Sequence, residues 1–410
     1  MRITWANFFH IYQPPQWSLQ IIRKVVRESY RPLLQVLRRH PHIHITLNVS
    51  ASLTEQLAHH GYRDIIRLIT AAARRGQVEL VGSAIYHPIL PKLPSHEVLR
   101  QIERNTKVNR AYFGSIYQPR GFFFPEMAYD PRVATLTQQL GFRWFILDEI
   151  AQRGELGAID PTFRYRHTHT GQTVIYRNKW LSDYIAFHIP LNKPNAFWDE
   201  VDHTAYTGHA FITAMDGETL GHHRPGAERL WERLVTNKRV QTVTISELIK
   251  QTPVARPTTP RRSSWSSRPE ELRRRQPYIL WDDATNSIHQ LQWQLCSRVI
   301  ALVQKSVKHP EYSKARTLLD QYCASDQWWW ASAKPWWSQK IIVSKATEWV
   351  ELANLLAPKQ RWAQTYADHI IHTAEVWQKQ NRFKRIADRY LAASPYTYVH
   401  YIGGKKITSS

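Results

Sequence analysis

The stretch Ile3–Pro14, with the sequence ITWANFFHIYQP, shows how the first part of this chain is built. The run from Ile3 to Phe9 is largely apolar and does not alternate with polar residues, which is typical of a strand whose two faces are both covered. His10 opens a more polar group that includes Tyr12 and Gln13, and Pro14 ends the strand pattern. We therefore predict a buried parallel strand with polar side chains at its carboxyl end.

The same arrangement recurs along the first 250 residues, where short apolar runs alternate with amphipathic segments. The predicted strands are Ile3–Phe9, His44–Val49, Val78–Val81, Gly121–Phe124, Arg143–Leu147, Ala210–Met215 and Gln241–Ile245. The predicted helices between them include Leu19–Arg39, Asp64–Arg75, Glu97–Tyr117 and Arg132–Leu140. Repeated strand–helix units with short connections indicate a parallel sheet, and this number of strands favours an α/β fold of the (β/α)7 type, an incomplete TIM barrel.

The composition changes beyond this region. Residues 252–283 are rich in Pro, Ser and Arg and follow neither period, so we interpret them as a linker or a lid loop. Four segments with helical spacing come next: Asn286–Val307, Lys314–Cys323, Trp336–Leu356 and Arg361–Leu391. We expect three parts: a catalytic barrel domain (1–251), the linker or lid (252–283), and a C-terminal helical bundle domain (284–410) that closes the cleft.

The composition of the 410 residues limits the possible partners and compartments. Only two cysteines are present, and no run of about 18 apolar residues predicts a membrane helix, so we expect a cytoplasmic protein with no membrane partner. The formal net charge of +22 would favour polyanions. The basic residues are scattered, however, and no zinc-finger, RRM or helix-turn-helix pattern organises them, so we expect no specific nucleic-acid partner.

Polar residues follow several of the predicted strands. They are Tyr86-His87, Pro125-Glu126, Asp148-Glu149, Asp216-Gly217-Glu218 and His222. Because the carboxyl ends of parallel strands open on one face of a barrel, we expect Glu126 and Asp216 to share one pocket. Two carboxyl groups that face each other across a sugar-sized cleft are the minimum needed to cleave a glycosidic bond.

Each of these residues also has a plainer interpretation. Glu126 fits an ordinary turn carboxylate, Asp216-Gly217 is a common turn dipeptide, and His10 could be a hydrogen-bonded core histidine. The 17 tryptophans, several of them clustered as in Trp328-Trp329-Trp330, suit the CH faces of sugars, although many should simply fill the core. The combination of paired acids, nearby histidines and clustered aromatic residues favours a carbohydrate site.

The motifs taken together resemble glycoside hydrolase family 57. The matching segments are His10-Ile-Tyr-Gln13-Pro14, Gly76-Gln-Val-Glu79, Phe122-Phe-Phe-Pro-Glu126, Met215-Asp216-Gly-Glu-Thr-Leu-Gly221 and, in the helical region, Asp326-Gln-Trp-Trp329. The sequence departs from the family pattern at Phe123-Phe124, where Trp-Leu is frequent, and at His222-His223 after Gly221.

The resemblance implies a retaining mechanism on α-linked glucans, with Glu126 as the nucleophile and Asp216 as the general acid/base. We expect no metal and no cofactor. The expected substrate-binding residues are His10, Tyr12, Gln13, Glu79, His87, His222, Trp265, Asp326 and Trp329. We further expect His10 or His222 to keep Glu126 charged.

Two alternatives stay open from the residues alone. A metal-dependent polysaccharide deacetylase or a zinc-containing mannosidase would use the histidines as ligands, although His10 lacks a neighbouring Asp. A non-catalytic carbohydrate- or polyanion-binding homologue would account for the basic charge. The sequence does not separate α-amylase, 4-α-glucanotransferase, branching and α-galactosidase activities, and it leaves the oligomeric state open.

Overall fold

The computed structural model describes residues 2–160, 163–203, 210–252, 254–393, 401–402 and 405–406. The chain divides into two compact units. The first comprises Met1–Ile85, Leu90–Trp265 and Val399–Ser410, and the second comprises Tyr86–Ile89 and Ser266–Tyr398. The division at Trp265 falls within the segment 252–283, which contains strand β10 (Ala255–Thr258) and helix α12 (Pro269–Arg273). Its interpretation as a lid stays a prediction.

A distorted barrel of parallel strands forms the centre of the first unit. Its strands among the described residues are β1 (Ile3–Ile11), β2 (Ile45–Val49), β3 (Val78–Val81), β4 (Gly121–Phe123), β5 (Trp144–Asp148), β7 (Thr173–Arg177) and β8 (Ala210–Asp216). Strands β3, β2, β1 and β8 pair in that order, and β7, β5 and β4 pair in a second sheet. All of these pairs are parallel, in agreement with the predicted α/β barrel.

Two seams join the sheets. At the first seam, Gly82 next to β3 exchanges backbone hydrogen bonds of 2.9 Å with Gly121 and Phe123 of β4. A Cβ atom on Gly121 would lie 2.1 Å from the ring of Trp144, so only glycine fits there. At the second seam, the backbone N–H of Asn178 after β7 donates to Ile212 of β8 at 2.8 Å.

The structure confirms the seven predicted strands as strands, but one of them does not belong to the ring of strands that forms the barrel. The predicted strand Gln241–Ile245 corresponds to β9 (Val240–Val243), which pairs with the start of β1 rather than completing the ring of pairs. The strand that completes the ring is β7, which the sequence did not predict. Strand β7 forms a hairpin with β6 (Arg164–His167), and β10 extends that sheet.

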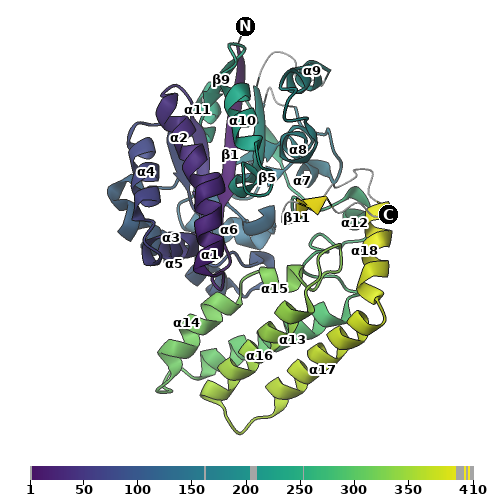
Figure 1. Cartoon of the computed structure of the whole chain (residues 1–410). Coiled ribbons are helices and arrows are strands. Elements are labelled where there is room, and N and C mark those ends of the chain that lie inside the picture. The colour runs from purple at the N-terminus through teal and green to yellow at the C-terminus, as the bar shows by residue number, and fades with distance from the viewer. Residues whose placement is uncertain are drawn as a thin grey trace. The chain divides into compact units, whose positions relative to one another are not determined.

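Helices surround the barrel strands (Figure 1). They are α1 (Leu19–Val25), α2 (Arg31–Arg39), α3 (Ala51–His59), α4 (Arg63–Arg74), α5 (Ser95–Phe113), α6 (Pro131–Gln139), α7 (Ile150–Arg153), α8 (Lys179–Asp183), α9 (Asn195–His203), α10 (Ala227–Val235) and α11 (Ile245–Gln251). Helices α1 and α2 are joined through a turn of π-helix, η1 (Val26–Tyr30). Apolar side chains of the strands and helices form one large buried cluster between the two layers.

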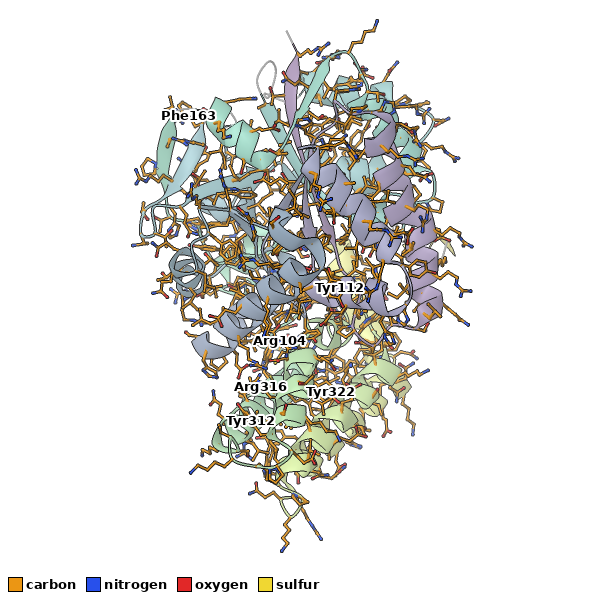
Figure 2. All side chains as sticks on the ribbon, turned by 90° about the vertical axis from the view of Figure 1, so that its left-hand side faces the viewer. Arg104, Tyr112, Phe163, Tyr312, Arg316 and Tyr322 are labelled. Carbon is orange, nitrogen blue, oxygen red and sulfur yellow. The ribbon has the colours of Figure 1, made fainter. Side chains whose placement is uncertain are left out.

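The second unit is helical. Besides α12 it contains α13 (Ser287–Lys305), α14 (Tyr312–Tyr322), α15 (Asp326–Trp329), α16 (Gln339–Leu356), α17 (Trp362–Lys379) and α18 (Arg382–Ala392). Helices α13, α14, α16 and α17 pack against one another (Figure 1). Arg316, labelled on α14 in Figure 2, forms a buried ion pair with Asp320 at 3.0 Å. The predicted helix Arg361–Leu391 is interrupted at Asn381, where φ is 51°.

No helix among the described residues combines the length and the apolar character needed to cross a membrane.

Candidate functional site

The inward-facing positions of the barrel strands change from apolar to polar toward the carboxyl ends. The buried interior cluster includes Ala6, Phe8, Ile146, Ile175 and Ala214. Because strand side chains alternate between faces, the next inward position on each strand lies two residues later. Those positions are occupied by His10, Asp148, Arg177 and Asp216, and Asn48 joins them from β2. The ladder places His10 beside both Asn48 and Asp216, and Asp148 beside Arg177.

Glu126 lies just beyond the end of β4 in an uncommon backbone conformation. Its φ of 59° and ψ of 17° fall in the left-handed region, as does Met127 with a φ of 47°, and side-chain-bearing residues rarely adopt this conformation. Trp265 donates two hydrogen bonds to Glu126, one from its backbone N–H to the Glu126 carbonyl at 3.1 Å and one from indole Nε1 to Oε2 at 2.7 Å. Trp265 therefore holds both the backbone and the carboxylate of Glu126.

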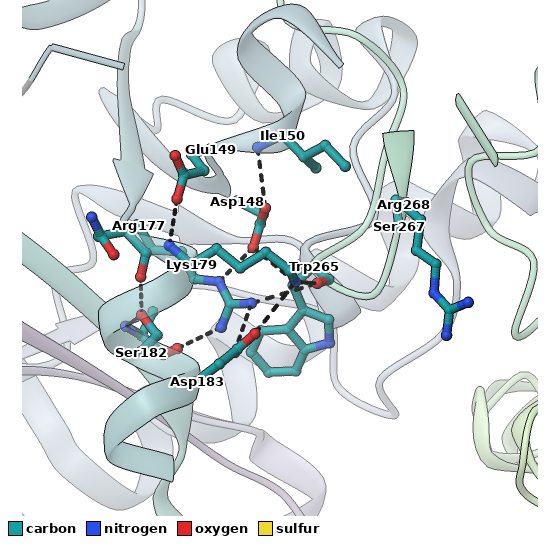
Figure 3. Close-up of polar contacts among 12 residues, drawn as sticks. Asp148, Glu149, Ile150, Arg177, Lys179, Ser182, Asp183, Trp265, Ser267 and Arg268 are labelled. Atoms are coloured by element: carbon teal, nitrogen blue, oxygen red, sulfur yellow. Dashed lines mark hydrogen bonds and ion pairs between the residues drawn. The ribbon is translucent and has the colours of Figure 1, made fainter. Parts of the chain in front are cut away.

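A buried pair of cations, Arg177 and Lys179, in turn holds Trp265 (Figure 3). The carbonyl of Trp265 accepts hydrogen bonds from Lys179 Nζ and, at 3.5 Å, from Arg177 Nη2. The Arg177 guanidinium also lies 5.3 Å from the centre of the indole ring. Asp148 accepts a hydrogen bond from Arg177 Nε at 2.7 Å, and Asp183 lies 3.6 Å from Arg177 and 3.7 Å from Lys179. Each buried cation is thus paired with carboxylates.

Asp216 ends β8 in a different environment. Its side chain is half-buried, and no hydrogen bond to it is formed by any residue that the structure describes. Burial raises the pKa of the Asp216 carboxyl to about 6, and the nearby positive charge of Arg177 opposes that rise. Arg177 also donates from Nη1 to the carbonyl of Ala214 at 2.7 Å. A carboxyl group with such a pKa can both give and take a proton near neutral pH.

Side chains of the π-helical turn η1 form hydrogen bonds with the loop that follows Asp216. Ser29 Oγ donates to the carbonyl of Gly217 at 2.7 Å, and the Tyr30 hydroxyl donates to Glu218 Oε1. A π-helical turn inserts an extra residue into a helix, and such turns often occur at functional sites. Here the turn presents two adjacent side chains to one loop.

Glu218 is a buried carboxyl near the half-buried Asp216. Burial raises the pKa of Glu218 to about 8, and the negative charge of Asp216 adds to the rise. Besides the Tyr30 hydroxyl, Glu218 Oε1 accepts hydrogen bonds from the backbone N–H of Tyr12 at 3.2 Å and from Gln13 Nε2 at 3.1 Å. The structure therefore brings the predicted residues Tyr12 and Gln13 to the loop of Asp216.

His222 lies farther along the same loop and contacts Glu28 through Nδ1 at 2.8 Å. Between Asp216 and His222 the chain passes Gly221, where φ is 107° and a Cβ atom would lie 1.9 Å from the carbonyl oxygen of Glu28. Only glycine permits this close approach to η1. The predicted residue His222 is thereby fixed at the outer end of the loop.

His10 is a neutral member of the polar layer. Burial lowers the pKa of its imidazole to about 4. Asn48 Nδ2 donates to the carbonyl of Val81 at 3.4 Å, so its Oδ1 faces His10 Nδ1 at 2.7 Å and accepts the Nδ1 proton. The ring stacks on Phe123 with centroids 4.6 Å apart and lies edge-on to Trp265 at 6.4 Å.

The expectation that His10 or His222 keeps Glu126 charged is therefore wrong for His10, because a buried imidazole with a pKa of about 4 carries no charge at neutral pH. His222 instead contacts Glu28. A hydrogen bond to the Glu126 carboxylate comes from the indole of Trp265.

Glu79 lies inside the barrel below the polar layer. It pairs in the ladder with Thr46, which lies two residues before Asn48, the partner of His10. Its carboxylate accepts hydrogen bonds from the side chain and, at 2.9 Å, the backbone N–H of Ser246, and from the Thr46 hydroxyl at 3.3 Å. Glu79 thus joins β2 and β3 to the start of α11.

Three of the predicted residues belong to the second unit. His87 Nδ1 contacts Ser325 Oγ at 3.1 Å. Asp326 begins α15 and Trp329 ends it. The ring of Trp329 stacks on Trp336 with centroids 4.2 Å apart. Their roles in binding stay predictions.

Sequence reasoning missed four residues of this arrangement: Tyr30, Asn48, Arg177 and Lys179. It named Asp148 after the predicted strand Arg143–Leu147 but gave it no role, although counting inward positions in steps of two along that strand points to it. The same count finds Asn48. Arg177 and Lys179 follow β7, which was not predicted, so no sequence signal connected them to the site.

Among the described residues, no group of three or more His, Cys, Asp and Glu side chains could hold a metal ion.

Comparison with known proteins identifies a family and a fold that this chain matches. The family model for Glycosyl hydrolase family 57 matches residues 4–259, more than half of the chain. An α-amylase of Pyrococcus horikoshii is 28% identical over 149 residues, which cover 36% of this chain and 23% of that protein. A 4-α-glucanotransferase of Thermococcus litoralis is 24% identical over 148 residues, which cover 36% of this chain and 22% of that protein. The matched stretch thus spans less than a quarter of these relatives.

A solved structure extends the comparison to the whole chain. The GH57-type branching enzyme from Pyrococcus horikoshii superposes with a TM-score of 0.70 at 17% sequence identity, covering 98% of this chain and 99% of that chain. At this identity the likeness shows the fold alone. It confirms the predicted α/β fold with a distorted parallel barrel followed by a helical region.

Proposed function

The chain belongs to Glycosyl hydrolase family 57, and from this premise we propose that it cleaves or transfers α-linked glucans with retention of configuration. Glu126 is the nucleophile in this proposal and Asp216 is the general acid/base. No cofactor takes part. The proposed substrate-binding residues are His10, Tyr12, Gln13, Glu79, His87, His222, Trp265, Asp326 and Trp329.

In the first step, one Glu126 oxygen attacks the anomeric carbon while the bond to the leaving oxygen breaks. Asp216 gives its proton to that leaving oxygen, so the departing sugar leaves as a neutral alcohol. The product is a covalent glycosyl-enzyme on Glu126, for which a retaining site needs carboxyl groups about 5–5.5 Å apart.

In the second step, a water molecule or a sugar hydroxyl attacks the same carbon from the face that the leaving group vacated. Asp216, now ionised, takes the proton of the attacking oxygen, and the bond to Glu126 breaks. Two displacements at one carbon restore the original configuration. Water as acceptor gives hydrolysis, and a glucan hydroxyl gives transfer or branching.

The observation that supports this assignment most is the contrast between the two carboxyl groups. Glu126 receives a hydrogen bond from the Trp265 indole at 2.7 Å, which favours the ionised form of a nucleophile. Burial raises the pKa of Asp216 to about 6, which suits a group that must be protonated in one step and ionised in the next.

The experiment is a comparison of Glu126→Gln with the unaltered enzyme on maltooligosaccharides. We expect Glu126→Gln to lose at least about 10⁴-fold in kcat, because an amide forms no stable glycosyl ester. The matched control is Glu155→Gln at an exposed carboxylate, which should keep full activity. NMR of the first products should show the α-anomer.

Undiminished turnover by Glu126→Gln, or a β-anomer as the first product, would overturn the assignment. The product profile of the unaltered enzyme then separates the activities. Net glucose or maltose release indicates hydrolysis, redistribution of chain lengths indicates transfer, and new branch points indicate branching.

A further inference from the structure

Lys179 is an unusual residue because its side chain is only 8% exposed. Lysine is almost never fully buried unless it is paired. Its ammonium group lies 3.6 Å from Asp148 and 3.7 Å from Asp183, and it donates a hydrogen bond to the main-chain carbonyl of Trp265 (Figure 3). Pairing with the two carboxylates accounts for its charge. The bond to the Trp265 carbonyl requires a separate explanation.

Trp265 uses each of its polar groups in one connected arrangement. Its carbonyl accepts from Lys179 and Arg177, while its backbone N–H and its indole N–H both donate to Glu126. The Trp265–Glu126 contact joins residues 139 positions apart, so only tertiary structure holds it. Glu126 and Met127 also occupy left-handed conformations that need outside support.

We propose that Lys179 is a positioning residue for the nucleophile, which it acts on through Trp265. The proposal rests on the proposed function, in which Glu126 attacks the sugar. Lys179 fixes the peptide of Trp265, the fixed peptide orients the indole, and the indole orients the Glu126 carboxylate. Its charge is paired with Asp148 and Asp183, and its hydrogen bond to the Trp265 carbonyl is the contact through which it acts.

Such positioning matters because displacement at carbon depends steeply on alignment. A shift of about 1 Å in a reacting group can cost about 100-fold in rate. A donor lost from an ionised carboxylate also makes that carboxylate easier to protonate, so the lower limb of the pH profile should move to higher pH.

Several charged or titratable groups face this arrangement from the surrounding elements and bear on any pH effect. They are His10 from β1, Asp148 and Glu149 from β5 and the loop after it, Arg177 from β7, Asp183 from α8 and Asp216 from β8. Their presence means that loss of the Lys179 charge alone could move a pH limb. The test must therefore separate charge from positioning.

The first experiment compares Lys179→Met and Lys179→Gln with the unaltered enzyme. Met removes both the charge and the donor, while Gln keeps a polar group near Asp148 and Asp183 but is one atom shorter than Lys. For both we expect kcat on maltooligosaccharides to fall about 10- to 100-fold with KM changed less than about threefold. The acidic limb of the pH profile of kcat/KM should move to higher pH by about half a unit or more.

The matched control is Arg262→Met, which removes an exposed cation three residues before Trp265 whose Nε donates to Asp130 at 2.7 Å. We expect this variant to leave kcat unchanged and to leave the acidic limb of the kcat/KM pH profile at the same pH. Lys179→Arg retains a cationic donor and should recover at least about a third of kcat.

The second experiment repeats Lys179→Met in a Trp265→Phe background, which lacks the indole donor. If Lys179 acts through Trp265, the single Trp265→Phe change moves the lower limb upward and Lys179→Met adds no further shift. A purely electrostatic effect of Lys179 would persist in the Trp265→Phe background and would overturn the proposal.

Unchanged kcat and pH limb in a folded Lys179→Met would also overturn it. Failure of both Lys179→Met and Lys179→Gln to fold would assign Lys179 to stability rather than to positioning, with the same consequence. These failures are distinct from a failure of the proposed function, which would appear as an unaltered enzyme without α-glucan activity or as a fully active Glu126→Gln.

Discussion

The two carboxyl groups at the carboxyl end of the barrel are supported in opposite ways. Glu126 sits in a left-handed backbone and is held by two hydrogen bonds from Trp265. Asp216 ends a regular strand, its carboxyl receives no hydrogen bond from any described residue, and it lies near the buried carboxyl of Glu218. The difference teaches that one barrel edge can give one carboxylate a hydrogen-bond donor while burial raises the pKa of another carboxyl, and the proposed retaining mechanism depends on such a contrast.

The largest expected effects come from removing each acid in turn and supplying a substrate with a reactive leaving group. This experiment tests whether the two carboxyl groups have different roles. On an α-maltosyl fluoride, fluoride leaves without protonation, so Asp216→Asn should lose less than about tenfold in the first step. On a maltooligosaccharide the same variant should lose about 10²- to 10⁴-fold. Glu126→Gln should be inactive on both substrates. The initial burst of fluoride release, measured with an ion electrode before the second step becomes limiting, reports the first step.

Equal losses for both variants on the fluoride would contradict the division of roles. A greater loss for Asp216→Asn than for Glu126→Gln would reverse it.

Substitution of Arg177 should have a smaller effect than removal of either acid, and it should act mainly on the pH dependence of the reaction. Its positive charge opposes the rise in the pKa of Asp216, so Arg177→Gln should raise that pKa further above about 6. Because the proposed acid must be protonated in the free enzyme, the upper limb of kcat/KM should move to higher pH by about half a unit or more. The measurement is a pH profile on maltooligosaccharides. Arg177→Lys keeps the charge and serves as the control.

An upper limb that stays in place, or that moves to lower pH in Arg177→Gln, would show that Arg177 does not act on the protonation of Asp216. The height of the profile is a separate matter, since the change also leaves Asp148 without its 2.7 Å partner.

The smallest expected effect concerns stability rather than rate. Burial raises the pKa of Glu218 to about 8 in the fold, above its value in the unfolded chain. The fold therefore holds that proton more tightly, and Glu218 lowers stability as pH rises from about 4.5 to about 8. Glu218→Gln removes this dependence while keeping an acceptor for Tyr30. Its drop in Tm between about pH 5 and about pH 8 should be smaller than that of the unaltered protein by about 2 °C or more.

Scanning calorimetry at the two pH values makes this measurement, with Glu155→Gln as the control for an exposed carboxylate. The same drop in Tm for Glu218→Gln and for the unaltered protein would refute the account of Glu218.

Much of the barrel could be predicted because its strands are buried on both faces and each ends at a change from apolar to polar residues. That change identified His10 and Asp216 as polar residues at the ends of predicted strands. The seventh strand of the ring escaped because Thr173–Arg177 lies between the polar stretch His167–Gln172 and Asn178, and its short run contains Arg177 itself. Missing this strand also hid Lys179.

The contacts that define the site could not be read from sequence for a different reason. Trp265 was predicted to bind substrate, yet its hydrogen bond to Glu126 spans 139 positions and depends on how a Pro- and Ser-rich segment folds. The role of Tyr30 depends on a π-helical turn that has no periodic signal of its own. Sequence patterns identify elements, whereas these contacts depend on packing between them.

The most direct test of the central claim is to trap the covalent intermediate. A fluorinated α-glucosyl fluoride that forms the glycosyl-enzyme quickly but releases it slowly should add one sugar mass to the protein, and peptide mass spectrometry should place that sugar on Glu126. The label should be absent from Glu126→Gln. A label on another residue would contradict the account. So would turnover of the reagent that leaves no covalent adduct and gives a product of inverted configuration.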